Sequence, residues 1–451
     1  MVNNVVAFRG PRTLRQPIAH FLRVGDSGHR KLAALRASGD LAFQRVVVDA
    51  PKLSHQRVLI DAFQADGAEI VLDTRVAELA APAKVGGMAR HAPWALDGNA
   101  LLGPDHFDPA RSDTVDRIAR FAVEQRVNAV LAPGHHLGDP RFGGWLDVDA
   151  RACVALREAL DREGGRHVGI DYSLIAPRTT LERIERRGDV VARLIDLPFD
   201  NLWIRATPYG SDAGPLVQRR FIEALSGLHN VGKPVVVDHV DGLAGAALVA
   251  FGVAGGIAHG IGERGRFNAA DWHKTPKERD PDDGFGRQKR IAVAGLDRSF
   301  TKAELRTLVS ARGARSLVVC QDRGCCARGL EDMIRDPRRH AARLSLGLME
   351  ELAAVPDALR AGHLVNGHVA DAARLADRMR RLKPLPATAE QHGVDPASLA
   401  GRLDRHCHTR EKIHDALENL LDERGDELAR SRPVIRRSVA DGTGIIRGAA
   451  A

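Results

Sequence analysis

The sequence has no apolar run long enough to cross a bilayer. A membrane-spanning helix needs about 18 or more consecutive apolar residues, and no such stretch occurs among the 451 residues. The first residues, MVNNVVAFRGPRTLRQP, also lack the apolar core and the small-residue cleavage site of a secretory signal. We therefore expect a soluble, cytoplasmic protein without a membrane partner.

Cysteine and aromatic residues are scarce. Five cysteines are too few for a disulfide framework, and three of them, Cys320, Cys325 and Cys326, lie within seven residues, which favours metal or redox chemistry. The net charge of +8 and the pI near 9.5 favour a polyanionic partner. Aromatic residues, at 4%, leave few surfaces on which single-stranded bases could stack. Charge alone therefore does not establish a nucleic-acid partner.

Short apolar, β-branched runs alternate with longer helical patterns. This alternation is typical of repeated βα units on a parallel sheet, whose strands are buried on both faces. The eight runs are residues 45–51, 69–74, 128–134, 167–173, 201–207, 234–240, 255–261 and 316–320. The sequence thus predicts an α/β fold, a (β/α)₈ TIM barrel. A doubly wound open sheet is the alternative, but the loop after the first run, DAPKLSHQ, lacks the Gly-rich phosphate-binding sequence.

The spacing of the runs divides the chain into three parts. We expect an N-terminal extension over residues 1–44, the barrel over 45–345, and a helical C-terminal extension over 346–451. Residues 262–300 contain the charged segment KTPKERDPDDGFGRQK, from which we predict a mobile lid over the strand ends.

Polar residues follow most of the predicted strands, and in a parallel barrel these strand ends converge on one face. The segment DHVDGLAG supplies Asp238, His239 and Asp241, and GGIAHGIGERGRFN supplies His259 and Glu263. We expect catalysis by Asp238, Asp241, His259 and Glu263, because adjacent carboxylates and imidazoles can supply a nucleophile or base and an acid. The substrate-binding residues expected from the strand ends are Asp49, His135, Asp171, Arg205, His239, Arg264 and Arg266.

The cysteine cluster follows the eighth predicted strand. It contains Cys320, Cys325 and Cys326, and His340 follows fourteen residues beyond Cys326 as a fourth possible ligand. Three thiolates and one imidazole make a closed tetrahedral zinc site, so we predict a structural zinc that clips the following helix to the barrel. The alternative is three buried thiols without a metal.

In this order, these features resemble the tRNA-guanine transglycosylase superfamily, whose zinc-carrying (β/α)₈ barrels exchange a guanine base in nucleic acid. The resemblance covers about residues 45–345 and rests on segments 67–79 and 106–132, on DHVDGLAG, and on the Cys₃His set. It implies that Asp97 takes the place of the first aspartate of the family's DSGGFQ motif and binds substrate. The family's nucleophilic aspartate has no counterpart in GGIAHGIGERGRFN.

Three functions remain open at this stage. The resemblance implies a transferase, a pentosyltransferase-like glycosyltransferase, that acts on a purine base or nucleoside, alone or in nucleic acid, with Asp238 or Asp241 as the attacking or stabilising carboxylate. A metal-dependent hydrolase or lyase would instead hold its metal on histidines from several strand ends. These histidines would be His135, His136, His239 and His259. The third alternative is a non-catalytic, zinc-containing nucleic-acid-binding relative. A homodimer is left open.

Overall fold

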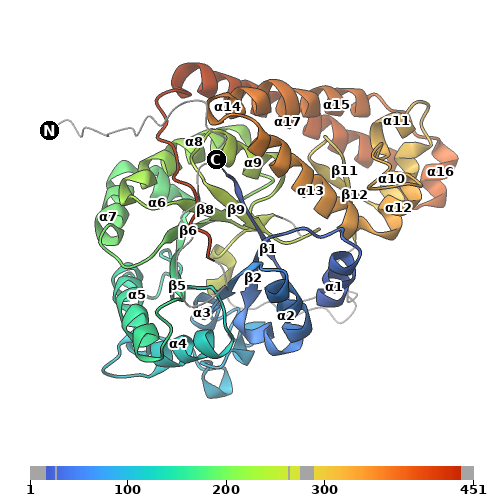
Figure 1. Ribbon diagram of the computed structural model, residues 1–451. Coiled ribbons are helices and arrows are strands. Elements are labelled where there is room, and N and C mark those ends of the chain that lie inside the picture. The colour runs from blue at the N-terminus through green and yellow to red at the C-terminus, as the bar shows by residue number, and fades with distance from the viewer. Residues whose placement is uncertain (1–16, 26–27, 263–264, 275–288, 438–451) are drawn as a thin grey trace.

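Eight parallel strands close into a barrel in the computed structural model, which describes residues 17–25, 28–262, 265–274 and 289–437 (Figure 1). The strand order is sequential around the barrel, and this confirms the predicted TIM-barrel class. The strands are β1 (Ala19–Arg23), β2 (Arg45–Asp49), β3 (Glu69–Asp73), β4 (Ala129–Leu131), β5 (Gly169–Pro177), β6 (Asn201–Thr207), β8 (Val235–Asp238) and β9 (Gly256–His259).

Helices surround the barrel, and most of them bury one apolar face, whereas Leu243–Ala250 of α9 are all buried. In α4, for example, Val115, Ile118, Ala119 and Ala122 recur at helical spacing and are buried. The larger helices around the barrel are α1 (His29–Ala37), α2 (Arg57–Ala65), α4 (Thr114–Glu124), α5 (Trp145–Arg162), α7 (Ile184–Leu194), α8 (Pro215–Leu228), α9 (Gly242–Ala250) and α13 (Pro337–Ala354). None of the described helices combines the length and the apolarity that crossing a bilayer requires.

Two strand assignments made from the sequence were wrong. The first barrel strand is β1, which lies inside the segment 1–44 expected to be an extension, and β1 pairs with both β2 and β9. Its sequence AHFLR carries His20 and Arg23, so it does not read as an apolar run. The run 316–320 instead forms a short helix, α11 (Arg315–Val318), outside the barrel. A short apolar run cannot be assigned to strand or helix by its pattern alone.

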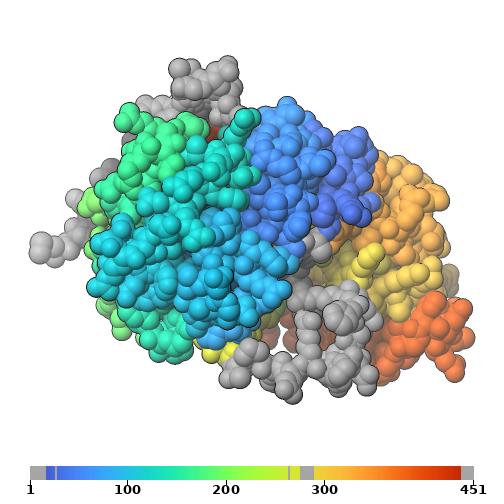
Figure 2. Space-filling view, turned by 90° about the horizontal axis from the view of Figure 1, so that it is seen from below, coloured from blue at the N-terminus to red at the C-terminus, as the bar shows by residue number. Residues whose placement is uncertain are grey.

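A second hydrophobic core lies beside the barrel, in what we call the second lobe. Figure 2 shows this lobe in orange next to the blue N-terminal part of the barrel. Its core includes Ile291, Phe300, Met333 and Leu403. The lobe is built from β11 (Arg290–Val293), β12 (Arg298–Thr301), α10 (Lys302–Val309), α11, α12 (Leu330–Arg335), α15 (Ala370–Arg380), α16 (Pro386–Gln391) and the first half of α17 (Pro396–Arg424).

The chain after α17 returns to the barrel and closes the N-terminal ends of its strands. Val434 packs among the inward-facing residues of the barrel. The guanidinium of Arg437 donates hydrogen bonds to Asp171 at 2.6 Å and to Glu69 at 3.2 Å. The buried carboxylates of Glu69 and Asp171 at this end are therefore paired with a buried cation, the guanidinium of Arg437.

Candidate functional site

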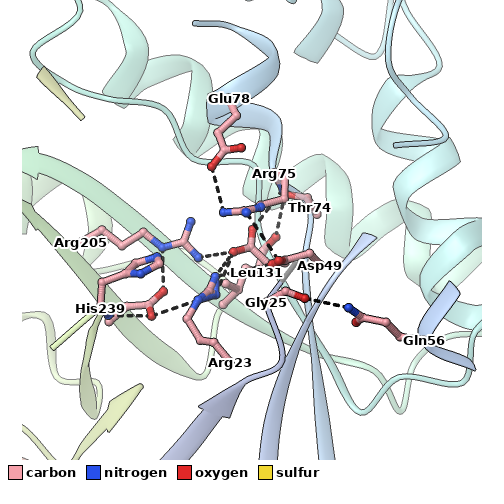
Figure 3. A network of polar contacts seen from close by, with 12 residues as sticks. Arg23, Gly25, Asp49, Gln56, Thr74, Arg75, Glu78, Leu131, Arg205 and His239 are labelled. Atoms are coloured by element: carbon pink, nitrogen blue, oxygen red, sulfur yellow. Dashed lines mark hydrogen bonds and ion pairs between the residues drawn. The ribbon is translucent and has the colours of Figure 1, made fainter. Parts of the chain in front are cut away.

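The C-terminal ends of the strands carry a buried network of arginines and aspartates, shown in Figure 3. Asp73, the last residue of β3, accepts hydrogen bonds on Oδ2 from Arg23 at 3.1 Å and from Arg205 at 2.6 Å. Asp238, the last residue of β8, accepts from Nε of Arg205 at 2.8 Å and lies 3.5 Å from Nε of Arg23. Two strands thus supply the carboxylates, and two others supply the guanidinium groups between them.

Strand alternation explains why these groups face inward. Val47, Val71 and Val236 belong to the apolar cluster inside the barrel. Because side chains on a strand alternate between its two faces, the next inward positions are two residues further on. Those positions are Asp49, Asp73 and Asp238. The barrel therefore changes from an apolar interior to a polar layer at the last residue of each of these strands.

The network forms the floor of the barrel mouth. It extends from Asp49 to Arg75 at 3.5 Å and from Arg75 to Glu78 at 2.9 Å. Burial alone would raise the pKa of Asp73, but Arg205 and Arg23 hold that pKa well below its ordinary value. The carboxylate of Asp73 therefore stays ionised and paired at neutral pH.

His239 follows Asp238 in the chain and lies next to Arg205 at the edge of this floor, as Figure 3 shows. It adopts a left-handed backbone conformation with φ of 60°, which is uncommon for a residue with a side chain. Its backbone N–H donates to Oδ1 of Asp238 at 2.9 Å. Burial lowers the pKa of the imidazole, Asp238 opposes this shift, and Arg23 and Arg205 add to it, so that the pKa comes to about 3. Its Nε2 is buried without a hydrogen-bond partner among the described residues.

A small cover closes over the mouth. β7 (Tyr209–Gly210) pairs with β10 (Arg266–Phe267), and a Cβ on Gly210 would come within 2.3 Å of the Gly265 carbonyl oxygen, so this pairing requires glycine. Phe267 stacks on His239 with ring centres 5.1 Å apart and also contacts Trp272. Phe267 and Trp272 pack in one apolar cluster with Ile175.

The prediction of one mobile lid over residues 262–300 is therefore wrong. Residues 266–273 pack over the mouth as β10 and a 3₁₀ turn, whereas residues 290–301 belong to the second lobe. Residues 263–264 and 275–288 of that prediction lie outside the described part of the chain.

A basic cavity of about 320 Å³ lies beside the mouth. It is lined by His29, Arg30, Lys52, His55 and Gln56. Helices α1 and α2 both begin there, at His29 and directly after Gln56, and helix N-termini favour anions. Gln56 donates from Nε2 to the carbonyl oxygen of Gly25 at 2.7 Å, which ties the cavity wall to the loop after β1. A larger cavity of about 720 Å³ in the second lobe has mixed lining, with Glu304 and Asp395 among lysines and arginines.

The predicted pairing of Asp238 with His259 is wrong. Asp238 pairs in register with Ala258, which faces the barrel interior, so Asp238 faces inward. His259 is the next residue along β9 and faces outward, where its ring contacts His20 and Phe43. The two side chains therefore lie on opposite faces of the barrel wall. Adjacent strand ends do lie side by side, but the two-residue period decides which face each side chain takes.

Two more predicted binding residues lie away from the mouth. Asp171 is the third residue of the nine-residue strand β5, and it accepts hydrogen bonds from Asn201 and Trp203 near the opposite end of the barrel. The sequence predicts a strand that ends near residue 173, whereas β5 continues to Pro177, which leaves Asp171 far from the mouth. His135 packs between the barrel and α5, where Nδ1 lies 2.6 Å from Asp149 and the ring stacks on Trp145.

The other predicted site residues are dispersed. Asp97 is exposed in a short turn. Arg266, on β10, forms an ion pair at 2.6 Å with Asp212 at the surface. Asp241 caps the N-terminus of α9 by accepting from Gly242 N–H at 2.7 Å. Glu263 and Arg264 lie outside the described residues. Of the predicted catalytic and substrate-binding residues, the mouth therefore brings together Asp49, Arg205, Asp238 and His239.

The histidines proposed as ligands of a catalytic metal do not converge. His136 stacks on His273, with ring centres 5.4 Å apart, while His135 pairs with Asp149 and His259 lies outside the barrel wall. Among the described residues, no group of potential metal ligands combines His135, His136, His239 and His259.

The predicted Cys₃His group does come together, in the second lobe. Cys320, Cys325, Cys326 and His340 are all buried, and their donor atoms lie within 4.8 Å of one another. Nδ1 of His340 is 3.3 Å from Sγ of Cys325 and 3.5 Å from Sγ of Cys326, and the two sulfurs are 3.6 Å apart. Tetrahedral zinc, with bonds of about 2.3 Å to sulfur and about 2.0 Å to nitrogen, implies S···N and S···S distances of about 3.5 and 3.8 Å. This buried group could bind a metal ion.

The surroundings of His340 fix its orientation. Its Nε2 lies 3.1 Å from the carbonyl oxygen of Ala292 on β11, so Nε2 carries the proton and Nδ1 presents its lone pair to the sulfurs. Burial raises the pKa of the Cys325 thiol to about 11, so metal binding has to displace thiol protons. Because Cys320 follows α11 and His340 lies on α13, an ion held by this group would join the second lobe to the helix that packs against β9 and β1.

Sequence reasoning missed Arg23, His20 and Ser345. Arg23 and His20 lie on the strand that we read as part of an extension. A pattern that indicates β1 was present in the sequence, because Ala19, Phe21 and Arg23 are spaced two residues apart and face the same side of a strand. Ser345 lies in the middle of α13 and contacts the barrel only through tertiary packing. No local pattern distinguishes it.

Comparisons with protein-family models and with curated proteins identify no relative of this chain. A scan against protein-family models finds no match to this chain, and a search of curated proteins finds none either. Function therefore has to be argued from the geometry of the barrel mouth and of the Cys₃His group.

Proposed function

We propose that this chain is a barrel enzyme that performs acid–base chemistry on a small anionic substrate at the barrel mouth. The observation that carries this proposal is His239. It combines a left-handed backbone, a buried Nε2 without a partner among the described residues, and a position next to Asp238 and Arg205 at the edge of the arginine and aspartate floor. Strained residues of this kind concentrate at functional sites. The basic cavity beside the mouth supports an anionic group on the substrate.

The chemistry of His239 follows from its environment. A pKa of about 3 keeps the imidazole neutral at physiological pH, so one ring nitrogen can donate a hydrogen bond and the other can accept one. Asp238 fixes the backbone of His239, and Phe267 fixes the plane of its ring. In the proposed reaction, Nε2 holds or moves the proton, while the paired carboxylates of the floor keep the site polar and rigid.

Base exchange on a purine, which the sequence resemblance implies, is less well supported. That reaction needs a carboxylate free to approach the sugar carbon and an acid near the departing base. Asp238 is held by Arg23 and Arg205, and His259 lies on the other face of the wall. We therefore propose the broader acid–base class, with a phosphorylated or carboxylated small molecule as substrate in place of nucleic acid.

We also propose that the Cys₃His group binds zinc with a structural role. Three buried thiolates and an imidazole leave no open position for a reacting molecule, and their spacing fits tetrahedral zinc. The ion would stabilise the second lobe and the position of α13. Elemental analysis of protein purified without chelator should find this zinc.

Metabolite turnover tests the proposed enzyme function. Purified protein is incubated with the small-molecule fraction of a cell extract, and the mixture is compared before and after by untargeted mass spectrometry. We expect wild type to consume at least one anionic metabolite and His239→Asn to lose this turnover at least about a hundredfold, the usual range for a general acid or base.

His408→Asn is the matched control, because His408 is exposed on α17, with a 70% accessible side chain. This variant should turn over the metabolite like wild type. Consumption by His239→Asn at the wild-type rate would contradict the proposal, and so would the absence of any turnover by well-folded wild type.

A further inference from the structure

A short π-helix interrupts the helical chain that follows α13. The helix α14 (Arg360–His363) runs directly into a π-helix over Leu364–Val369, which continues into α15. The apolar side chains of this π-helix, Leu364, Val365 and Val369, are buried. π-Helices are rare, and they are frequent at functional sites. The polar side of this segment is therefore a candidate for a site outside the barrel mouth.

Two histidines on this segment contact one carboxylate of α13. Nε2 of His363 and Nε2 of His368 each lie 2.9 Å from Oε1 of Glu351. The ligand atoms of the three side chains all lie within 4.8 Å of one another. Without an ion, each imidazole donates a hydrogen bond from Nε2 to this oxygen. Two imidazoles and a carboxylate thus direct their donor atoms at one point.

The π-helix explains why both imidazoles reach the same carboxylate. At 3.6 residues per turn, residues five apart on an α-helix point about 140° away from each other. The hydrogen bonds of a π-helix run between residues five apart, so such residues lie one above the other. His363 and His368 are five residues apart, and the π-helix begins directly after His363. The departure from α-helical geometry therefore aligns the two rings.

A glycine precedes each histidine, at Gly362 and Gly367. Glycine inside a helix lowers its stability relative to alanine. Neither glycine has the positive φ that would favour this residue, and a Cβ at either position would meet no atom within 4 Å. Backbone conformation and packing therefore do not require glycine at these positions. The two glycines leave open space beside each imidazole, which suits an ion with further ligands from solvent.

We propose that Glu351, His363 and His368 form a binding site for a divalent transition-metal ion such as zinc. Imidazole and carboxylate are ligands that such ions accept, and two histidines with one glutamate are a known ligand set for zinc. Bonds of about 2.0–2.2 Å place neighbouring ligand atoms about 3 to 3.5 Å apart. The 2.9 Å contacts are close to this range. When the ion binds, the proton of each imidazole moves from Nε2 to Nδ1, and Nε2 offers its lone pair.

This site differs from the Cys₃His group in its coordination and its access to solvent. Three protein ligands leave at least one position for water or an external ligand, whereas Cys₃His is a closed set. The side chains of Glu351, His363 and His368 are 49%, 39% and 28% exposed. We therefore expect an ion that exchanges with solvent, in contrast to the buried ion of the Cys₃His group.

Cobalt binding tests this inference with a probe that also occupies thiolate sites. The full chain, without an affinity tag, is stripped of metal and dialysed to equilibrium against Co²⁺, and bound cobalt is counted by elemental analysis. Wild type should bind two equivalents, one of which shows thiolate-to-cobalt charge-transfer absorption. His363→Ala should bind one equivalent and keep that absorption in full. Cys326→Ser should lose the absorption and keep the other equivalent.

His414→Ala is the matched control. His414, Asp415 and Glu418 form another group of potential ligands, and the side chain of His414 is 22% exposed, close to the value for His368. This group lies on the α-helix α17, without a π-helix to align its donors. The control should leave both equivalents in place.

His368→Cys provides a gain of signal at the same position. A thiolate there should add a second charge-transfer absorption, and the further change His363→Ala should abolish the added absorption. Circular dichroism confirms that each variant is folded before cobalt is counted.

Three results would overturn the inference. Wild type would bind a single cobalt ion that Cys326→Ser removes, or folded His363→Ala would keep two equivalents, or the second equivalent would be lost with His414→Ala. None of these results bears on the mouth or on His239, so the inference can fail while the proposed function stands.

Discussion

Replacement of Asp73 by asparagine should destabilise the barrel strongly. One carboxylate oxygen of Asp73 lies between the guanidinium groups of Arg205, at 2.6 Å, and Arg23, at 3.1 Å. Asp73→Asn keeps the shape of the side chain and removes its charge, so two buried cations lose a shared counterion. Removal of one partner from a buried ion pair costs about 3–5 kcal/mol. We expect the free energy of unfolding to fall by this amount.

Tryptophan fluorescence in urea measures this effect on the barrel itself. The four tryptophans, Trp94, Trp145, Trp203 and Trp272, all lie in the barrel, its helices or the loops over its mouth. The matched control is Asp97→Asn, at an exposed position, which should change the free energy by less than about 0.5 kcal/mol. If Asp73→Asn also stayed within about 0.5 kcal/mol of wild type, the reasoning about a buried network would be refuted.

Other perturbations address the mouth, the metal group and the cavity. His239→Asn should reduce the pH dependence of the free energy of unfolding. The pKa of His239 is about 3 in the folded protein and lies below its unfolded value, so between pH 7 and 5 this residue takes up a proton only in the unfolded state. Wild type should lose about 2 kcal/mol of stability over this range through His239, and the variant should not. Identical pH slopes in urea titrations would contradict this. Cys326→Ser should lose one zinc per chain and lower the melting temperature, and unchanged zinc content would refute the ligand set. Lys52→Ala should weaken binding of inorganic phosphate about fivefold by calorimetry, as loss of about 1 kcal/mol implies. The control Lys302→Ala, in the cavity of the second lobe, should leave the phosphate affinity unchanged. An equal loss of phosphate affinity in both variants would contradict an anion site beside the mouth.

The sequence predicted the barrel because its strands are apolar on both faces. Strands such as β2 and β8 read as continuous valine runs that end in aspartate, a pattern with few alternatives. β1 was missed because a short strand that carries His20 and Arg23 resembles a polar segment. Residues 316–320 were misread because four or five apolar residues satisfy a helix as well as a strand.

The candidate site was only partly predictable, for geometric reasons. Local sequence identified Asp238 and His239 as strand-end residues, and the close spacing of the cysteines identified the metal group with His340. Local sequence did not reveal that Asp238 and His259 take opposite faces, because this depends on the register between β8 and β9. Ser345 reaches the barrel only through the packing of α13, which no local pattern encodes.

The location of a bound substrate tests the central claim most directly. Once the turnover comparison identifies a metabolite, a crystal structure of His239→Asn soaked with that compound would show where it binds. We predict that the compound occupies the mouth between residue 239 and the arginine and aspartate floor, with its anionic group in the cavity lined by His29 and Lys52. Occupancy only of the 720 Å³ cavity in the second lobe, with nothing bound at the mouth, would contradict the account.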